Sequence, residues 1–226
     1  MPVVIFNGPP GCGKDAACLL YKNMGYTHLS FKEELFKETF KFFGVSKEWF
    51  MKGYENRDIK EKPVPQLKVS GKSFSRRDAM IYVSEKFIKP KYGKDYFGKQ
   101  LANQMTSEGL FCVSDGGFQE ELSPIINKFG AESITIIQLT REGCDFSSDS
   151  RRYFNGNLVQ EFMLGKETPI VKCHFLPDQF PIRTYRVHNN DSIDSFHRTL
   201  RAIHEKESND RKINQKAEGV TDKDIM

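Results

Sequence analysis

Long apolar runs are missing from this sequence of 226 residues. Its apolar stretches, such as VVIF, LFCV and ITIIQL, are far shorter than the roughly 18 residues that a membrane-spanning helix needs. The chain does not open with a basic flank followed by a long apolar stretch, so a secretory signal is not expected either. We therefore expect a cytoplasmic protein without a membrane partner.

Paired cysteines are missing as well. The five cysteines, Cys12, Cys18, Cys112, Cys144 and Cys173, are scattered along the chain and form no CxxC pair. Neither a disulfide framework nor a zinc site is therefore predicted, and reduced thiols fit the expected cytoplasmic location. The five histidines show no metal-ligand spacing, and no nucleophilic triad is evident.

The overall charge does not select a class of partner. The formal net charge is +4, and 38% of the residues are hydrophobic. That composition is typical of a globular chain with one sizeable core, and the sequence contains no internal repeat. Mild positive charge suits polyanionic small molecules as well as nucleic acid.

Apolar runs alternate with amphipathic segments along the chain. Buried strands are predicted at PVVIF near the start, at LFCVSD from residue 110 and at SITIIQL from residue 133. Helices are predicted between them, including residues 31–43 with Gly44 as C-cap and a helix with Ser75 as N-cap. The alternation predicts an α/β fold with a doubly wound parallel sheet flanked by helices.

Three segments are expected to lie outside this regular pattern. Residues 53–74 have charges, prolines and glycines without periodicity, which predicts an irregular, mobile excursion. A last strand is predicted at residues 184–189 and a last packed helix at 191–203. From about residue 205 apolar residues become rare, so a frayed or disordered tail is expected.

The segment NGPPGCGK follows the first strand and precedes a helix. Gly8 is separated by four residues from Gly13 and Lys14, which is the spacing of a phosphate-binding loop. The glycines let successive N–H groups turn toward an anion, the helix adds its positive end, and the lysine reaches the β and γ phosphates. The alternative is a glycine-rich turn without a ligand.

Asp15 stands where this motif usually has a serine or threonine that ligates Mg²⁺. A bare carboxylate beside triphosphate oxygens is repelled unless a cation or a water lies between them. Asp15 therefore indicates altered metal handling. Two alternatives remain open: a favourable interaction with the positive helix N-terminus, or a hydrogen bond within the loop.

Asp115 ends the predicted strand LFCVSD, at the edge where ligands gather in open α/β sheets. We expect it to hold Mg²⁺ through water or to position an acceptor phosphate. The alternative is that it caps a helix beginning near Phe118.

Phosphoryl transfer between two anions needs positive charge that follows the migrating group. Arg77 opens the helix after the irregular excursion, where it is suited to grip an acceptor phosphate bidentately. Arg141, Arg151 and Arg152 follow the SITIIQL strand in a polar segment that we interpret as a lid. Each arginine is equally well explained as a solvated surface residue.

Six stretches occur in a set order: GPPGCGKD, HLSFKEEL, SRRDAMIYVSEKFIKPKYGKDYFG, VSDGGFQEEL, TREGCDFSSDSRRY and VHNNDSIDSF. This ordered set, over roughly residues 1–204, resembles the P-loop nucleoside monophosphate kinases, and more closely the bacteriophage deoxynucleoside monophosphate kinases. The Lys-Asp form of the loop also resembles that of animal phosphomevalonate kinases, so it is not unique to nucleotide substrates.

The resemblance implies a P-loop kinase domain over residues 1–204, with an acceptor-binding region at about 30–106, a lid at about 141–166 and a charged tail at 205–226. The implied ATP contacts are Gly8, Gly11, Cys12, Gly13, Lys14, Asp15 and Ala16, with Asn189 and Asn190 near the adenine. Both asparagines also suit a turn and helix N-cap. The implied acceptor contacts are Ser30, Phe31, Arg77, Asp115 and Gly116, and Trp49 and Tyr96 are further aromatic candidates, although such residues are more often core aromatics.

The implied reaction moves the γ-phosphoryl group of ATP to a (deoxy)nucleoside 5′-monophosphate, with Mg²⁺ as the metal, for deoxynucleotide supply in DNA synthesis. The implied catalytic residues are Lys14, Asp15, Arg77, Asp115, Arg141, Arg151 and Arg152, and Asp15 and Asp115 are the metal candidates. If a phage encodes the chain, the compartment is the host cytoplasm.

Two other functions compete with this one. The first is a P-loop kinase of another small phosphorylated metabolite. The second is a non-catalytic ATP-binding module that acts through partners, with the basic stretch at 57–77 contacting nucleic acid. The sequence lacks the interleaved aromatic and basic residues of single-strand binders, so we expect no nucleic acid partner. Both a monomer and a homodimer fit the sequence.

Overall fold

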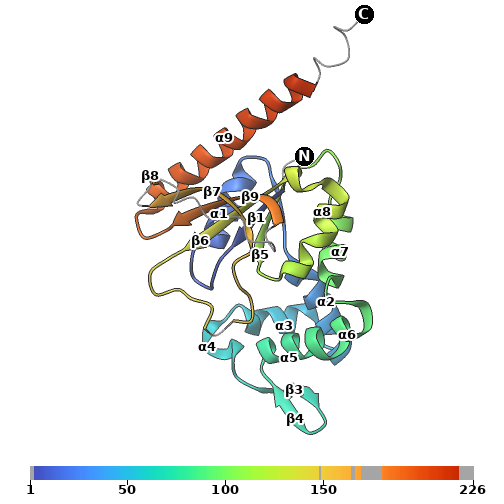
Figure 1. Cartoon of the computed structure of the whole chain (residues 1–226). Coiled ribbons are helices and arrows are strands. Elements are labelled where there is room, and N and C mark those ends of the chain that lie inside the picture. The colour runs from blue at the N-terminus through green and yellow to red at the C-terminus, as the bar shows by residue number, and fades with distance from the viewer. Residues whose placement is uncertain (1–2, 148, 164–165, 169–179, 219–226) are drawn as a thin grey trace, which may run out of the picture.

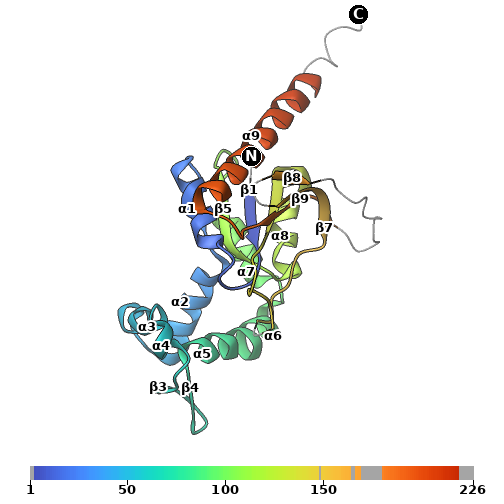
Figure 2. The ribbon, with the colours of Figure 1, turned by 90° about the vertical axis from the view of Figure 1, so that its left-hand side faces the viewer.

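The computed structural model describes residues 3–147, 149–163, 166–168 and 180–218 (Figure 1). A central sheet with helices on both sides forms the body of the molecule. A helical arm lies at one end of this body, and the C-terminal helix projects from the opposite end (Figures 1 and 2).

The central sheet has seven strands in the order β2-β5-β1-β6-β9-β7-β8. Every neighbouring pair is parallel except β7 and β8, which are antiparallel. The predicted α/β fold with a mostly parallel sheet is therefore confirmed. The strands are β1 (Val3–Asn7), β2 (Thr27–Leu29), β5 (Phe111–Gly116), β6 (Ile134–Thr140), β7 (Gly156–Met163), β8 (Lys166–Thr168) and β9 (Phe180–His188).

Alternate residues of the central strands supply two separate cores. On β1, Val4 and Phe6 pack with α1 (Lys14–Asn23) and with the first turns of α9 (Ile193–Glu218). Val3 and Ile5 face the other side, where α7 (Tyr96–Gln104) and α8 (Ser123–Phe129) cover the sheet. Because both faces are covered, the strands are nearly uniform in apolar character, as expected for a parallel sheet.

The arm is the chain between β2 and α7. It contains α2 (Phe31–Phe43), α3 (Lys47–Tyr54), α4 (Arg57–Lys60), β3 (Val64–Val69), β4 (Lys72–Phe74), α5 (Arg76–Val83), a π-helical turn η1 (Ser84–Ile88) and α6 (Lys89–Tyr92). Phe50, Leu67, Ala79 and Met80 form its own small core. The two predicted helix caps are confirmed: Gly44 is left-handed with φ 63°, and the Ser75 hydroxyl accepts from the Asp78 N–H.

The expectation of an irregular excursion at residues 53–74 is wrong. This segment ends α3, forms α4 and then makes the hairpin β3-β4, in which Val69 pairs with Lys72. The two turn residues between them, Ser70 and Gly71, both have positive φ, at 48° and 85°, which is the backbone of the tight hairpin turn. Only Leu67 of β3 is fully buried, so the strand gives no apolar alternation to recognise.

The expected disordered tail is also corrected, because α9 continues through residue 205 to Glu218. The cause is a buried acid that apolar periodicity does not reveal. Glu207 is only 4% exposed, accepts hydrogen bonds from the hydroxyls of Thr135 and Tyr185, and pairs with Arg183 and Arg211. Residues 219–226 lie outside the described part of the chain.

The lid was predicted as a segment outside the sheet over residues 141–166, but only its first part connects two strands. Residues 156–163 form β7, which hydrogen-bonds to β9 inside the central sheet. Among the described residues, no helix combines the length and the apolar character that a bilayer crossing requires.

The Glu207 contacts predict a large loss of stability on truncation of this side chain. Glu207→Ala leaves two arginines and two hydroxyls at the sheet without their shared acceptor, so we expect a loss of about 3 kcal/mol in the free energy of unfolding. Glu205→Ala, an exposed acid on the same helix, is the control and should change it by less than about 0.5 kcal/mol. Urea unfolding measures both, and equal effects of the two substitutions contradict the assigned role.

Candidate functional site

The loop between β1 and α1 lies at the carboxyl ends of the parallel strands. Gly11 and Gly13 have positive φ, at 82° and 105°, which side chains rarely tolerate. Gly8 has no room for a side chain, because a Cβ there would overlap the Leu139 carbonyl oxygen. The three glycines therefore let the loop turn tightly against β6 before α1 begins at Lys14.

The loop is braced from the next strand by Asn189. Its side-chain amide donates to the Cys12 carbonyl at 3.0 Å, and its N–H donates to the Thr140 carbonyl at 2.8 Å. A Cβ on Gly13 would lie 2.5 Å from this amide nitrogen. Asn189 thus braces the loop, a role that differs from its predicted position near the adenine. Asn190 is exposed, and its side chain accepts a hydrogen bond from the Glu142 N–H.

Lys14 lies across the loop. Its ammonium donates to the carbonyls of Gly8 at 2.7 Å and Pro9 at 2.6 Å. Burial lowers the pKa of Lys14, and the positive charges of Arg151 and Lys32 lower it further. The lysine therefore lies among other cations and donates only to uncharged groups, the two carbonyls and the Cys12 thiol, which an anion is able to replace.

The other predicted loop residues differ in exposure. Cys12 is fully buried, and burial raises the pKa of its thiol, so it is an uncharged packing residue. Asp15 is exposed in the first turn of α1, and Ala16 beside it is half-buried. No three His, Cys, Asp or Glu side chains in the described ranges come together as a metal site.

Asp115 is brought to the predicted acceptor residues, but its carboxylate serves as a helix cap. It accepts from the Ser30 hydroxyl at 2.8 Å, from the Phe31 N–H at 3.0 Å and from the Lys32 N–H at 2.9 Å. Sequence reasoning considered a cap for a helix near Phe118, whereas the helix that Asp115 caps is α2, 84 residues earlier. Three donors therefore hold this carboxylate in place, and a water-bridged metal role for Asp115 stays a prediction.

Two other predicted acceptor contacts have structural roles. The Phe31 ring is 5% exposed and belongs to the core below the sheet, so it is not available as a stacking platform. Gly116 is closely packed, because a Cβ there would lie 2.7 Å from Ile5 and 2.8 Å from Phe154.

Arg151 is the predicted arginine with the most defined position. Its Nε donates to both carboxylate oxygens of Asp149, at 3.0 and 3.1 Å, and its Nη2 also contacts this carboxylate. The aliphatic part of the side chain lies over Gly117, where a Cβ would be 2.5 Å from Arg151 Cβ. The remaining nitrogen, Nη1, is buried and has no hydrogen-bond partner among the described residues.

The chain that follows Arg151 is fixed to the ends of the central strands. The side-chain amide of Asn7 donates to the Arg152 carbonyl at 3.0 Å and accepts from the Phe154 N–H at 2.8 Å. Arg152 and Arg141 themselves are exposed. Two of the four predicted arginines, Arg77 and Arg151, both lower the pKa of Tyr54. These two therefore act electrostatically on the same side chain of the site.

Sequence reasoning missed three further side chains of this site: Lys32, Tyr54 and Lys60. Burial raises the pKa of Tyr54, while Arg77 and Arg151 oppose this. The Lys60 ammonium lies 4.5 Å from the centre of the Tyr54 ring, and burial together with Lys32 lowers the pKa of Lys60. Nothing in the sequence distinguishes these two lysines from the other lysines of the arm, because only the fold brings them to the loop.

Arg77 is half-buried and pairs with Glu61 at 3.6 Å. The two remaining aromatic candidates are used in packing. The guanidinium of Arg76 covers the Trp49 ring at 4.5 Å, and the Tyr96 ring stacks on Tyr92. Neither ring is therefore an open platform for a base.

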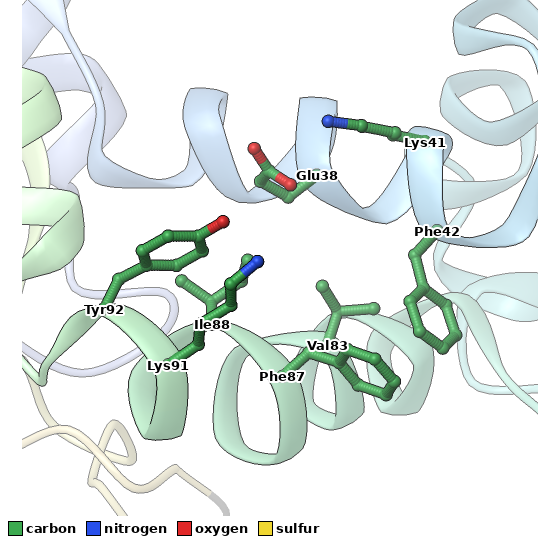
Figure 3. A pocket seen from close by; sticks show the side chains of 8 residues that line it. All are labelled: Glu38, Lys41, Phe42, Val83, Phe87, Ile88, Lys91 and Tyr92. Carbon is green, nitrogen blue, oxygen red and sulfur yellow. The ribbon is translucent and has the colours of Figure 1, made fainter.

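A separate cavity of about 290 Å³ lies on the arm, between α2 and the segment from α5 to α6 (Figure 3). The Glu38 carboxylate, the Lys91 ammonium and the Tyr92 hydroxyl point toward its interior (Figure 3). Its remaining lining residues are Lys41, Phe42, Val83, Phe87 and Ile88. None of the lining residues belongs to the loop from Gly8 to Lys14, so this cavity is distinct from the site at the strand ends.

Comparison with models of known protein families found no match, and comparison with curated proteins found none either. The chemistry of the site is therefore argued from its own residues.

The ion pair of Asp149 and Arg151 predicts a stability that depends on pH. Burial opposes the ionisation of Asp149, but hydrogen bonds from Arg151 outweigh it and lower the pKa of the carboxyl to about 2. A carboxyl whose pKa is lower in the folded state than in the unfolded state stabilises the fold. This contribution is complete at pH values above the unfolded pKa, which is near 4, and it is lost as the pH falls toward 2. Asp149→Asn should thus cost about 1 to 2 kcal/mol at pH 7 and progressively less between pH 5 and pH 2.

Urea unfolding at several pH values measures this difference. Glu142→Gln, which changes an exposed acid of the same segment, is the control and should show no such trend. A cost for Asp149→Asn that stays constant across this pH range contradicts the assignment.

Proposed function

We propose that the protein transfers the γ-phosphoryl group of ATP to a (deoxy)nucleoside 5′-monophosphate and releases the diphosphate and ADP. One observation carries this proposal: Lys14 of the loop, Arg151 after β6, and Lys32, Lys60 and Arg77 of the arm interact electrostatically at the carboxyl edge of one parallel sheet. Cations that reach one place from two sides of the molecule suit a reaction between two phosphorylated ligands. The proposal includes the P-loop NTPase fold, with the arm as the acceptor-binding insertion.

The residues of the chain would divide the work between the two substrates. The loop from Gly8 to Gly13, with Lys14, would bind the ATP phosphates through its N–H groups and its ammonium. Arg77, Lys32 and Lys60 would bind the acceptor phosphate, and Arg151 would stabilise the charge of the group in transfer. The acceptor phosphate is itself the nucleophile and is already ionised at neutral pH, so neither a covalent intermediate nor a general base is needed.

Asp15 offers Mg²⁺ an exposed carboxylate, whereas the carboxylate of Asp115 already accepts three hydrogen bonds. Mg²⁺ in nucleotide sites is usually bound by one or two carboxylates, the substrate phosphates and water. Asp15 is an exposed carboxylate one residue beyond Lys14, which suits such a ligand or a water-bridged one. The bound metal would supply charge neutralisation between phosphates, and Asp15 would orient it.

The first test is ADP production from ATP and Mg²⁺ with a panel of deoxyribo- and ribonucleoside monophosphates, with phosphomevalonate and with no acceptor. Turnover with nucleoside monophosphates alone supports the proposal and a role in deoxynucleotide supply, in the cytoplasm of a host if a phage encodes the chain. Turnover with phosphomevalonate alone assigns another metabolite as acceptor. ATP binding without any turnover assigns a non-catalytic module.

Lys14→Ala should lower the transfer rate about 100-fold or more, because it removes the loop's own cation from the transferred phosphoryl group. The fold should persist, since the lysine contacts only loop carbonyls and the Cys12 thiol. Lys22→Ala removes an exposed lysine from the other end of α1 and is the matched control. An active Lys14→Ala enzyme would refute the phosphate-loop assignment.

Asp15→Ser restores the hydroxyl usual in this loop and tests the role of the carboxylate. If Asp15 orients the metal, we expect the Mg²⁺ concentration that gives half-maximal rate to change severalfold, while the unfolding midpoint stays within a few degrees. Titration of Mg²⁺ at fixed ATP measures this. An unchanged titration curve means that Asp15 acts only at the helix N-terminus.

A further inference from the structure

The cavity on the arm (Figure 3) combines a buried apolar floor with an exposed aromatic ring. Val83 and Ile88 form the floor and are 1% and 5% exposed. Phe87 beside them is 46% exposed, yet its ring is held by the rings of Phe42 and Tyr82, at centroid distances of 4.3 and 6.1 Å. A large ring that is exposed but fixed in orientation gives a flat ligand a preformed surface.

The backbone beside the cavity is irregular. Phe87 and Ile88 lie in the π-helical turn η1, where the Lys89 N–H donates to the Ser84 carbonyl, five residues earlier. Such turns are rare, and they occur frequently at functional sites. The backbone therefore points to a binding site at this place independently of the shape of the cavity.

Three charged side chains line the cavity and form no ion pair with one another in the described part of the chain. Glu38 and Lys41 come from α2, and Lys91 comes from α6. The Glu38 carboxylate points into the cavity (Figure 3), and the one hydrogen bond to it among the described residues is long, at 3.5 Å from the Tyr96 hydroxyl. A half-buried carboxylate and two exposed lysines are therefore free to bind a ligand.

Helix α2 lies between this cavity and the site at the strand ends. On one side of the helix, the Phe36 ring contacts the Tyr54 ring of that site, with 5.0 Å between the centroids. Residues two apart in an α-helix point about 200° away from each other, so Glu38 faces the other side. A ligand in the cavity would therefore bind outside the proposed reaction.

The lining residues indicate the chemistry of this ligand. Two exposed lysines suit a doubly charged anion such as a phosphate monoester, which stays hydrated at the rim. A carboxylate beside an apolar floor suits N–H donors on the edge of a flat ring. A nucleotide has both features, and guanine is the nucleobase that presents two adjacent N–H donors, N1–H and the 2-amino group, to one carboxylate. The volume of about 290 Å³ is at the small end for ligand pockets, which suits a base inside and a phosphate outside.

We propose that this cavity binds a guanine nucleotide at a second site, separate from the reaction. The base would lie against Phe87, with its N1–H and 2-amino group donating to Glu38. The phosphate would lie between Lys41 and Lys91. This inference goes beyond the proposed function, because it concerns binding on the far side of α2 and needs no turnover.

Isothermal titration calorimetry of the full chain with guanosine 5′-monophosphate, without ATP, tests this inference. Glu38→Gln keeps the shape of the side chain but puts an N–H₂ donor against the donors of guanine, so the Kd should rise about tenfold or more. Glu33→Gln changes an exposed acid on the same helix and is the control, with an unchanged Kd. Inosine 5′-monophosphate lacks the 2-amino group and should bind wild type about tenfold more weakly.

Arg77→Ala separates the cavity from the proposed acceptor site, because that site would also take this nucleotide. A binding event that Glu38→Gln weakens and Arg77→Ala leaves unchanged supports the inference. An event that only Arg77→Ala weakens is acceptor binding alone, which overturns the inference and leaves the proposed function standing. No event in wild type also overturns it. If light scattering then gives a mass of two chains that Phe87→Ser reduces to one, the exposed ring belongs to an interface between copies of the chain.

Discussion

The buried carboxylate of Asp115 joins the arm to the sheet, and the geometry of the site depends on this joint. Asp115 ends β5, and the Ser30 hydroxyl with the N–H groups of Phe31 and Lys32 all donate to it. These N–H groups belong to the first turn of α2, where no intrahelical acceptor exists. Because hydrogen bonds to an ionised acceptor are strong and directional, the cap fixes where α2 starts and, through it, the arm. Lys60 and Arg77 are carried on that arm.

A second set of polar contacts closes the other side of the site. The Asn7 side chain uses both ends of its amide, donating to the Gly116 and Arg152 carbonyls and accepting from the Phe154 N–H. One buried side chain thereby holds two neighbouring segments at the end of β1. Arg151 directly precedes this anchored stretch, so its position follows from the sheet. The absence of a side chain at Gly117 then leaves room for the arginine to lie against the strand end.

Local rules in the sequence predicted the parts of the fold that depend on near neighbours. The apolar runs gave β1, β5 and β6, and Gly44 and Ser75 marked the ends of two helices correctly. The hairpin β3-β4 was missed because Leu67 is the only fully buried residue of β3, so the strand shows no alternation of apolar and polar residues. The end of α9 was missed because Glu207, a charged residue, occupies a core position that only its partners on β6 and β9 make favourable.

The site itself was predictable only where one stretch of chain forms it. The residues that shape the loop from Gly8 to Lys14 all lie within that loop, so the spacing of its glycines and lysine was sufficient to predict it. Asp115 was singled out for its place at a strand end, but its partners come from a helix 84 residues earlier, and no local pattern reports such a contact. Lys32 and Lys60 come to the site in the same way, because the fold brings distant segments together.

The cations of the site differ in how each is held, and this difference bears on how a phosphate would bind. Lys14 donates to two carbonyls, so a phosphate has to replace neutral acceptors. Arg77 pairs with Glu61, more than half of whose side chain is exposed, and such a pair is weak and easily rearranged. Arg151 needs no rearrangement, because Asp149 holds two of its nitrogens and leaves Nη1 unpaired. A group that is already oriented loses no energy in reorganisation when charge develops beside it, which is the condition for strong electrostatic stabilisation of a transition state. Among the described cations, Arg151 meets that condition best.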